Sequence, residues 1–374
     1  MRGGPPGVHV RWIELIGFRG YTSLTFAPEP GLNVLVGKNG QGKTSLLEAL
    51  HVLLTGRSFR TAKLADCLGW DAGGRATVAG ELAAGSRMRA VRLELSAREG
   101  GVEVRGTLCP WAGAVSFAAS DLALLAGGPH LRRAYLDGAT ARLLPAHAEA
   151  CRRYRLALQQ RTRLLGDLVG RPDGARLLAP WDEQLAALGS EILHRRLETL
   201  AFLADAVREV QLALAPDVAG VTLSYEASVA PAGEREATRQ ALLDVLVEAR
   251  PGDLRRGLTR FGPHRDDVAV RLGRADARTA ASRGEQRLLA LALRLAVALV
   301  ARRRHGEGPV LLLDDVLSEL DRDVGGRVLG WLEGQGQVVY TATDAQPAAR
   351  GSGAGWQVSA GRLAPSEALT QGAA

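Results

Sequence analysis

The sequence predicts an α/β fold whose mixed sheet is interrupted in the chain by an inserted helical lobe. Three observations support this prediction. An apolar run at residues 31–36 precedes a glycine-rich loop and a leucine-spaced helix that ends near Gly56. A second apolar run, Val310 to Leu313, ends in two aspartates. Between them, residues 143–165 and 181–214 carry apolar residues at i, i+3, i+4 and i+7, the spacing of amphipathic helices.

The composition is that of a soluble globular protein. The chain has 374 residues, of which 46% are hydrophobic and 23% are charged, enough for one large domain or two ordinary ones. It has no apolar run long enough for a transmembrane helix, and its start lacks the apolar segment of a secretory signal. The cysteines lie far apart and outside any metal-binding spacing, which predicts free thiols in the cytoplasm: Cys67, Cys109 and Cys151.

Residues 37–44, GKNGQGKT, match the pattern G-x-x-x-x-G-K-[ST] of a phosphate-binding loop, placed between a predicted strand and a predicted helix. The glycines allow backbone N–H groups to face an anion, and the helix N-terminus adds partial positive charge. We expect Lys43 to reach the β- and γ-phosphates and Thr44 to ligate Mg²⁺. The residues expected around the nucleotide are Gly37, Lys38, Asn39, Gly40, Gln41, Gly42, Lys43, Thr44 and Ser45.

The second apolar run, PVLLLDD (309–315), predicts a parallel strand that is buried on both faces. Acidic residues at the C-terminal end of such a strand lie where open α/β sheets bind their ligands. We therefore expect Asp314 to hold Mg²⁺ through water and Asp315 to polarise the attacking water. The alternative is a solvated loop, since paired aspartates often follow strands.

Residues 281–304 predict a long helix that is apolar on nearly all sides and therefore buried. At its start, Ser282 and Glu285 have the spacing of a capping box, which is a purely structural role. The functional alternative is a second anion site at this helix N-terminus, formed by Ser282 and Gly284 with Gln286 behind them.

Four motifs, in this order, resemble those of ABC-type ATPases. These are the loop at 37–44, SRGEQ (282–286) as the signature loop, LLLDD (311–315) as the Walker B strand and SELD (318–321) as the D-loop. The resemblance implies an ABC-type ATPase head that binds ATP and Mg²⁺ and works as a dimer with two sandwiched nucleotides. It places Ser318 and Asp321 in the D-loop. In such a dimer, one subunit's signature loop closes on the other's ATP through Ser282, Arg283, Gly284, Glu285 and Gln286.

Further stretches resemble the RecF family, an SMC-like branch of these ATPases. The signature stands more than 200 residues after Thr44, and the inserted helices are similar to an SMC coiled-coil arm shortened to one hairpin, although a plain helical subdomain fits equally. The stretches that carry the resemblance are IGFRGY (16–21), GRSFRT (56–61), SDLALLAGGPHLRRAYLD (120–137), LQQRTRLL (158–165) and GPHRDD (262–267).

This resemblance implies a cytoplasmic recombination mediator in DNA replication, repair and the SOS response. It implies ATP-driven dimerisation at gapped or single-/double-strand DNA junctions, with RecR as partner and RecO and RecA acting indirectly. It also implies a weak DNA-dependent ATPase whose slow turnover acts as a timer. Two alternatives are a transporter-type ATPase, which the long insertion and the absence of a switch histidine in VVYTATD (338–344) disfavour, and an assembly ATPase that never binds DNA.

The net charge of +7 fits DNA binding through phosphates, although an arginine-rich coding bias explains most of it. Aromatic residues make up only 5%, so no sequence-reading platform is expected. The γ-phosphate sensor is unassigned, with His264 as a candidate. The arginines considered for DNA contact, with a solvated face as the alternative, are Arg57, Arg60, Arg132 and Arg133, and more weakly Arg152, Arg153 and Arg161.

The predicted organisation has four parts. Residues 1–115 form the N-terminal part of the head, with antiparallel hairpins at 74–108. Residues 116–254 form the helical lobe, and residues 255–350 form the C-terminal part of the head. Residues 351–374, rich in glycine and alanine, are expected to be a loose tail.

Overall fold

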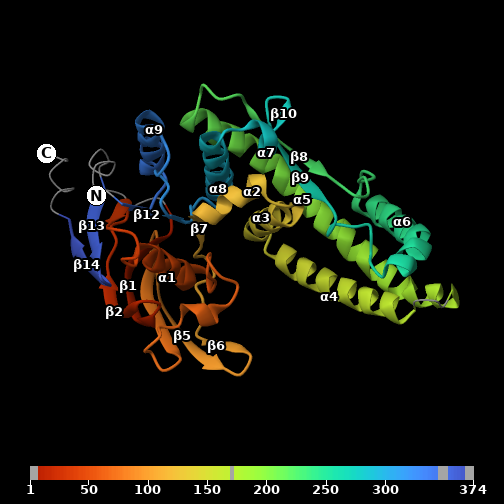
Figure 1. The fold of residues 1–374 in the computed structure, drawn as a ribbon, viewed down its shortest axis with the longest axis horizontal. Helices are drawn as coiled ribbons and strands as arrows, with labels where there is room; N and C mark the ends of the chain where they lie inside the picture. The colour runs from red at the N-terminus through yellow and green to blue at the C-terminus, as the bar shows by residue number, and fades with distance from the viewer. Residues whose placement is uncertain (1–6, 169–171, 344–352, 367–374) are drawn as a thin grey trace. The chain divides into compact units, whose positions relative to one another are not determined.

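The computed structural model describes residues 7–168, 172–343 and 353–366 (Figure 1). It divides into two compact units, which are described separately. The head unit comprises Met1–Leu122, Glu209–Val218 and Arg283–Ala374, and the helical unit comprises Ala123–Arg208 and Ala219–Ser282. The chain therefore enters the head unit three times.

A six-stranded sheet with the order β14-β13-β3-β12-β11-β7 forms one layer of the head unit. All its neighbouring strands are parallel except β13 and β14, which form an antiparallel hairpin. Its central strands consist entirely of buried residues, as expected for a parallel sheet covered on both faces. The strands are β3 (Leu32–Val36), β7 (Ala114–Phe117), β11 (Val310–Leu313), β12 (Val338–Ala342), β13 (Ala354–Ser359) and β14 (Arg362–Pro365).

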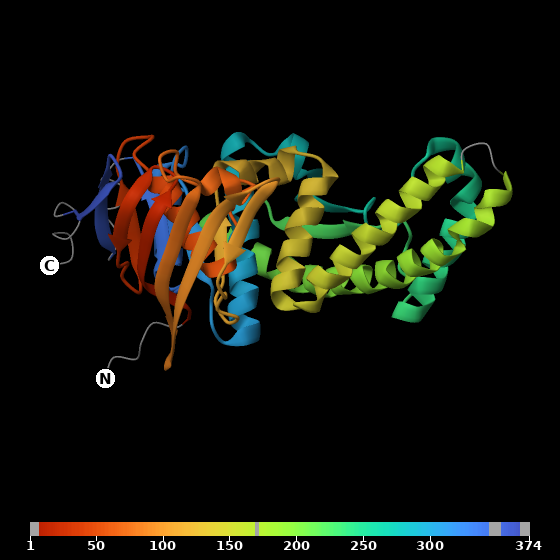
Figure 2. The same ribbon diagram turned by 90° about the horizontal axis from the view of Figure 1, so that it is seen from below.

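A second, antiparallel sheet with the order β2-β1-β4-β5-β6 forms another layer of the head unit (Figure 2). Buried and exposed residues alternate along β2 and β5, so one face packs inward and the other meets solvent. This confirms the antiparallel hairpins predicted for residues 74–108. The strands are β1 (His9–Phe18), β2 (Tyr21–Phe26), β4 (Arg75–Ala84), β5 (Arg87–Arg98) and β6 (Gly101–Arg105).

Helix α1 (Lys43–Thr55) packs between the two sheets of the head unit. Its buried leucines, among them Leu46, Leu50 and Leu53, join one hydrophobic core with residues of β1, β4, β5, β11 and β12. The helix ends at Gly56, which has a left-handed backbone as expected for a helix-terminating glycine. The other helical elements of this unit are η1 (Leu64–Cys67), η2 (Ala119–Leu122), α8 (Arg283–His305) and α9 (Arg322–Glu333).

The helical unit is built around three long helices (Figure 1). Ala150 and Tyr154 of α4, Ile192 of α5, and Leu242 and Leu246 of α6 belong to a shared buried core. A small antiparallel sheet with the order β10-β9-β8 completes the unit. Its elements are α2 (Ala123–Ala126), α3 (Pro129–Leu143), α4 (Ala146–Asp167), η3 (Pro172–Leu178), α5 (Ala179–Leu214), β8 (Val221–Glu226), α6 (Arg235–Arg256), β9 (Asp267–Leu272), β10 (Ala275–Asp276) and α7 (Ala277–Ala280). The end of α5, residues 209–214, belongs to the head unit.

Several boundaries differ from the sequence-based expectation. Residues 116–122 and 209–218, expected in the helical lobe, belong to the head unit. Residues 255–282, expected in the head, belong to the helical unit because β9 pairs with β8 over six residue pairs. The tail expected to be loose after residue 350 contains the β13–β14 hairpin, held by the pairing of β13 with β3. Strand β13 was not predicted because the segment is rich in glycine. In the structure, Trp356 and Val358 of β13 pack against the head core.

Within the described residues, no helix combines the length and the apolar character needed to cross a bilayer.

Candidate nucleotide site

The loop between β3 and α1 has the backbone of a phosphate cradle. Gly40 and Gly42 have φ values of 80° and 108°, a left-handed region in which side chains are strained. Helix α1 then begins at Lys43 with no side-chain cap, so its first N–H groups point toward the loop. The local sequence therefore creates a positively polarised concavity suited to an anion.

The Lys43 side chain lies inside this loop. Its Nζ donates hydrogen bonds to the carbonyl oxygens of Gly37 and Lys38, the latter at 3.0 Å. Burial lowers the pKa of Lys43, while the charges of Asp314 and Asp315 act in the opposite direction. The ammonium group is thus held inside the loop by backbone carbonyl oxygens.

Thr44 and Asp314 meet although they are 270 positions apart in the chain. The Thr44 hydroxyl lies 3.0 and 2.9 Å from the two carboxylate oxygens of Asp314. Hydroxyl and carboxylate oxygens are the donors that Mg²⁺ prefers, so these two residues fit the predicted magnesium site. The structure thereby brings together the residues assigned to the metal from the two ends of the sequence.

Thr341 connects the two aspartates of the Walker B strand. Its hydroxyl donates to Asp314 Oδ1 at 2.9 Å and accepts from the backbone N–H of Asp315 at 2.7 Å. Asp315 has a φ of 52°, which is unusual for a residue with a side chain. Thr341 therefore holds both the Asp314 carboxylate and the backbone that positions Asp315.

The segment after Asp315 is held by Arg287 of α8. This guanidinium donates to the Asp315 carbonyl oxygen and to Ser318 Oγ, the latter at 2.8 Å. Asp321 caps α9 by accepting hydrogen bonds from the N–H groups of Asp323 and Val324. The residues expected in the D-loop thus have local structural partners.

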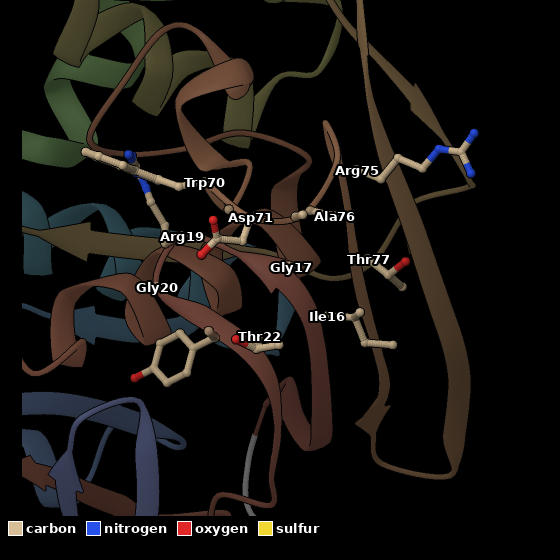
Figure 3. A pocket seen from close by; sticks show the side chains of 13 residues that line it. Ile16, Gly17, Arg19, Gly20, Thr22, Trp70, Asp71, Arg75, Ala76 and Thr77 are labelled. Atoms are coloured by element: carbon tan, nitrogen blue, oxygen red, sulfur yellow. The ribbon is translucent and has the colours of Figure 1, made fainter.

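A cavity of about 670 Å³ is lined by residues 39–45 of the P-loop and by Asp314, Asp315 and Thr341. A neighbouring cavity of about 580 Å³ lies beside the β1–β2 turn (Figure 3). Arg19, Gly20, Tyr21 and Trp70 line both cavities. Trp70 is 98% exposed, yet the preceding Gly69 donates a 2.7 Å hydrogen bond to the Gly17 carbonyl oxygen. An anchored, fully exposed indole at the rim is suited to stack on a flat ring.

Glu48 of α1 organises the loop that follows this helix. Its buried carboxylate accepts two hydrogen bonds of 2.8 Å from Arg19 and one of 2.5 Å from Ser58. Burial alone would raise the pKa of Glu48, but these hydrogen bonds and the nearby charges of Arg19 and Arg60 lower it. Glu48 thus fixes Arg19 at the edge of the cavity as part of an ion pair.

The signature residues lie at the start of α8. Ser282 directly precedes the helix and is exposed, as is Arg283. Gly284, Glu285 and Gln286 form its first turn. This placement is consistent with both interpretations made from the sequence, a helix cap and an anion site.

The arginines considered for DNA contact differ in their surroundings. Arg57 and Arg60 are exposed, and Arg60 lines the larger cavity. Arg132 is buried and forms a two-pronged ion pair with Asp267 at 2.8 and 2.7 Å, and Arg133 donates to the Asp266 carbonyl oxygen at 2.6 Å. Arg161 is fully buried against Asp182 and Asp253. The expectation that Arg132 and Arg161 contact DNA is therefore corrected, because both are committed to internal ion pairs.

His264 is likewise an internal residue of the helical unit. Its Nδ1 lies 2.8 Å from the Tyr154 hydroxyl and its Nε2 lies 3.1 Å from the Thr259 carbonyl oxygen. Burial lowers the pKa of His264 to about 4. These contacts favour the structural role over that of a phosphate sensor. Thr343 is exposed, and Asp344 lies outside the described residues.

Sequence reasoning missed several residues of this site: Arg19, Tyr21, Thr341, Trp70 and Ala360. A polar threonine in the otherwise apolar run VVYTA was the available signal for Thr341. Tyr21, whose hydroxyl donates to the Gly42 carbonyl oxygen at 3.0 Å, gave no such signal.

Comparisons with known proteins agree with this geometry. The model of a family described as "AAA domain" matches residues 13–108, which contain the P-loop. The chain is 36% identical to the DNA replication and repair protein RecF of Heliobacterium modesticaldum, over 90% of this chain and 92% of that protein. It is 37% identical to RecF of Frankia alni, over 95% of this chain and 99% of that protein. The chain belongs to the RecF family. It is thus a member of a family of DNA replication and repair proteins.

Solved structures extend this assignment to the fold. The RecF-family chain matches a structure described as the recombination mediator protein RecF with ATP in the RecFOR pathway, with a TM-score of 0.85 and 26% identity over 98% of this chain and all of the other. It also matches an Smc head domain from Pyrococcus furiosus with a TM-score of 0.54 and 15% identity over 96% of each chain. The predicted ABC-type, SMC-like ATPase fold is confirmed.

Proposed function

We propose that this chain binds ATP with Mg²⁺ and hydrolyses it at the site between the P-loop and the Walker B strand. The contact of Thr44 with Asp314 carries the proposal, because it joins the phosphate loop after β3 to a carboxylate at the end of β11, which lies two strands along the same sheet. The matched RecF structure with ATP supports the same ligand.

The residues have separate roles in this proposal. The P-loop N–H groups and Lys43 bind the β- and γ-phosphates, while Thr44 and Asp314 hold Mg²⁺, which would neutralise charge on the phosphates. Asp315 polarises and positions the attacking water. Asp315 is one methylene shorter than glutamate and adopts a strained backbone, which is a physical reason for slow hydrolysis. Trp70 and Tyr21 line the same cavity and are the aromatic side chains that would be available to the base of the nucleotide.

We further propose that ATP drives dimerisation, with Ser282 and Gly284 of one subunit closing on the nucleotide of the other. Their position at the start of α8 supports this role, since helix N-termini bind anions. The dimer would bind gapped duplex DNA without sequence preference and act with RecR, and indirectly RecO, in aiding RecA. Its slow, DNA-dependent hydrolysis would then time release in the cytoplasm.

Light scattering of the wild type and of Ser282→Arg, with and without ATP, tests the dimer. We expect ATP to convert the wild-type monomer to a dimer, the variant to stay monomeric, and gapped duplex DNA to bind the dimer alone. If ATP binds but the molecular mass of the wild type does not change, the dimer proposal is wrong and Ser282 acts only as a helix cap.

The salt dependence of DNA affinity distinguishes the proposed function from the alternative, an assembly ATPase that never binds DNA. For DNA contact through phosphates, the logarithm of the ATP-dependent affinity should fall with the logarithm of salt by about 0.9 per phosphate. No ATP-dependent affinity at low salt would favour the alternative.

A further inference from the structure

The β13–β14 hairpin lies directly against the P-loop. Strand β13 pairs in parallel with β3, which leads into the loop, so that Trp356 faces Leu35 and Gln357 faces Val36. Beyond this pairing, the Val358 carbonyl oxygen lies so close to Gly37 that a Cβ at this position would clash with it. The first residue of the P-loop is therefore a glycine for a second reason, the close approach of the hairpin.

The turn of this hairpin has a backbone N–H that the hairpin's own strand pairing leaves available to the loop. Ser359 pairs with Arg362, which leaves Ala360 and Gly361 as a two-residue turn with φ values of 47° and 72°. Both values are left-handed, as in the turns that suit tight hairpins. The first residue of such a turn has an N–H that the hairpin does not use. Here the N–H of Ala360 donates to Gln41 Oε1 at 2.7 Å.

Gln41 belongs to the P-loop, between the two left-handed glycines that shape the cradle. Ala360 and Gly361 line the same cavity as Lys43 and Thr44. The hairpin thus contacts the phosphate loop through one hydrogen bond, which the Ala360 N–H donates to the Gln41 side chain, and one close backbone contact. An alanine in a left-handed conformation is strained relative to glycine, so the surrounding contacts must hold it there.

We propose that the β13–β14 hairpin is a brace for the P-loop, with Gln41 as the positioning residue that couples the hairpin to nucleotide binding. The proposal rests on the ATP binding proposed above. When the turn is docked, Gln41 is held and the loop keeps the backbone that binds phosphate. Because coupling is reciprocal, bound nucleotide should stabilise the docked hairpin by the same factor by which the docked hairpin tightens nucleotide binding.

The test compares Gln41→Leu, which keeps the size of the side chain but cannot accept the hydrogen bond, with Gln41→Glu, which retains an acceptor. Ala360→Gly is the matched control in the hairpin, because it keeps the N–H and relieves the strain. Each full-length variant is measured for ATP affinity by calorimetry and for hydrogen exchange of the 354–365 backbone with and without ATP.

In the wild type we expect ATP to slow exchange in the hairpin. Gln41→Leu should bind ATP about fivefold more weakly, the effect of one lost hydrogen bond, and its hairpin exchange should no longer respond to ATP. Gln41→Glu should recover the protection of the hairpin measured without ATP, and Ala360→Gly, which keeps the N–H, should keep a hairpin whose exchange responds to ATP. Wild-type affinity and wild-type exchange in Gln41→Leu would overturn the brace.

Failure of the proposed function gives a different result. If the wild type does not bind ATP, that function is wrong, and the brace is then judged by exchange in the protein alone. Faster hairpin exchange in Gln41→Leu than in the wild type and Gln41→Glu would support the contact as a brace. Equal exchange in all three would overturn it.

Discussion

Thr341 offers the sharpest test of the catalytic geometry, because one hydroxyl connects both aspartates. Replacing it with valine keeps the shape of the side chain and removes the bond to Asp314 Oδ1 at 2.9 Å and the bond from the Asp315 N–H at 2.7 Å. A hydrogen bond contributes about 1 kcal/mol net, and more when one partner is charged.

The expected loss is therefore about 2 kcal/mol in positioning the Walker B aspartates, which corresponds to roughly a thirtyfold fall in kcat. ATP affinity should change little, because the P-loop and Lys43 make the main phosphate contacts. Thr341→Ser retains the hydroxyl and is the matched control.

Steady-state phosphate release measures kcat, and calorimetry with a slowly hydrolysed ATP analogue measures affinity. Undiminished turnover in Thr341→Val would refute the reasoning. An equal loss in Thr341→Ser would also refute it, since the hydroxyl would then not be the group that matters.

Three further predictions concern the base, the pH dependence and the core. Trp70→Ala should weaken ATP binding about tenfold, as loss of base stacking predicts, without affecting inorganic tripolyphosphate; equal losses in calorimetry would contradict stacking. The unfolded chain takes up a proton on His264 near pH 6.5, whereas the folded protein does so only at about 4, so stability should fall as pH drops through this window. In urea unfolding, the free energy of unfolding of the wild type should fall by roughly 3 kcal/mol over this pH range, and His264→Gln should not show this fall. If both proteins lose the same stability as the pH drops, His264 is not the cause. Arg161→Met should cost about 3 kcal/mol of unfolding free energy because it removes the fully buried one of the two arginine partners of Asp182 and of Asp253, while the exposed Arg163→Met should be nearly neutral; similar losses would argue against the buried network.

The parts of the site that were predictable are those encoded by contiguous residues. The P-loop and the Asp314–Asp315 pair each carry a local pattern, a strand followed by a chemically distinctive loop. Their meeting in space could be expected, because parallel strands end at the same edge of a sheet. Thr341 was not predicted as a site residue because its role depends on the register of β12 with β11, in which Leu313 faces Tyr340.

The misplaced arginines have a different cause. Arg132 and Arg161 belong to amphipathic helices, in which an arginine is normally exposed. Their partners Asp267 and Asp253 stand 135 and 92 positions away and are identified only by the tertiary fold. The β13–β14 hairpin was missed because glycine and alanine, which are frequent in it, are uncommon in strands, and its stability comes from pairing with β3.

The position of β3 has a consequence for synthesis of the protein. This strand, Leu32–Val36, leaves the ribosome early, yet both of its neighbours come from the far end of the chain, β12 beginning at Val338 and β13 at Ala354. At about 5–20 residues per second, the apolar strand waits for some tens of seconds with both edges unpaired. During that interval the nascent chain displays an aggregation-prone segment and an incomplete phosphate loop. Chaperone binding to the ribosome-attached chain should therefore persist until the last strands emerge, and a chain truncated before residue 338 should remain insoluble even though its P-loop is intact.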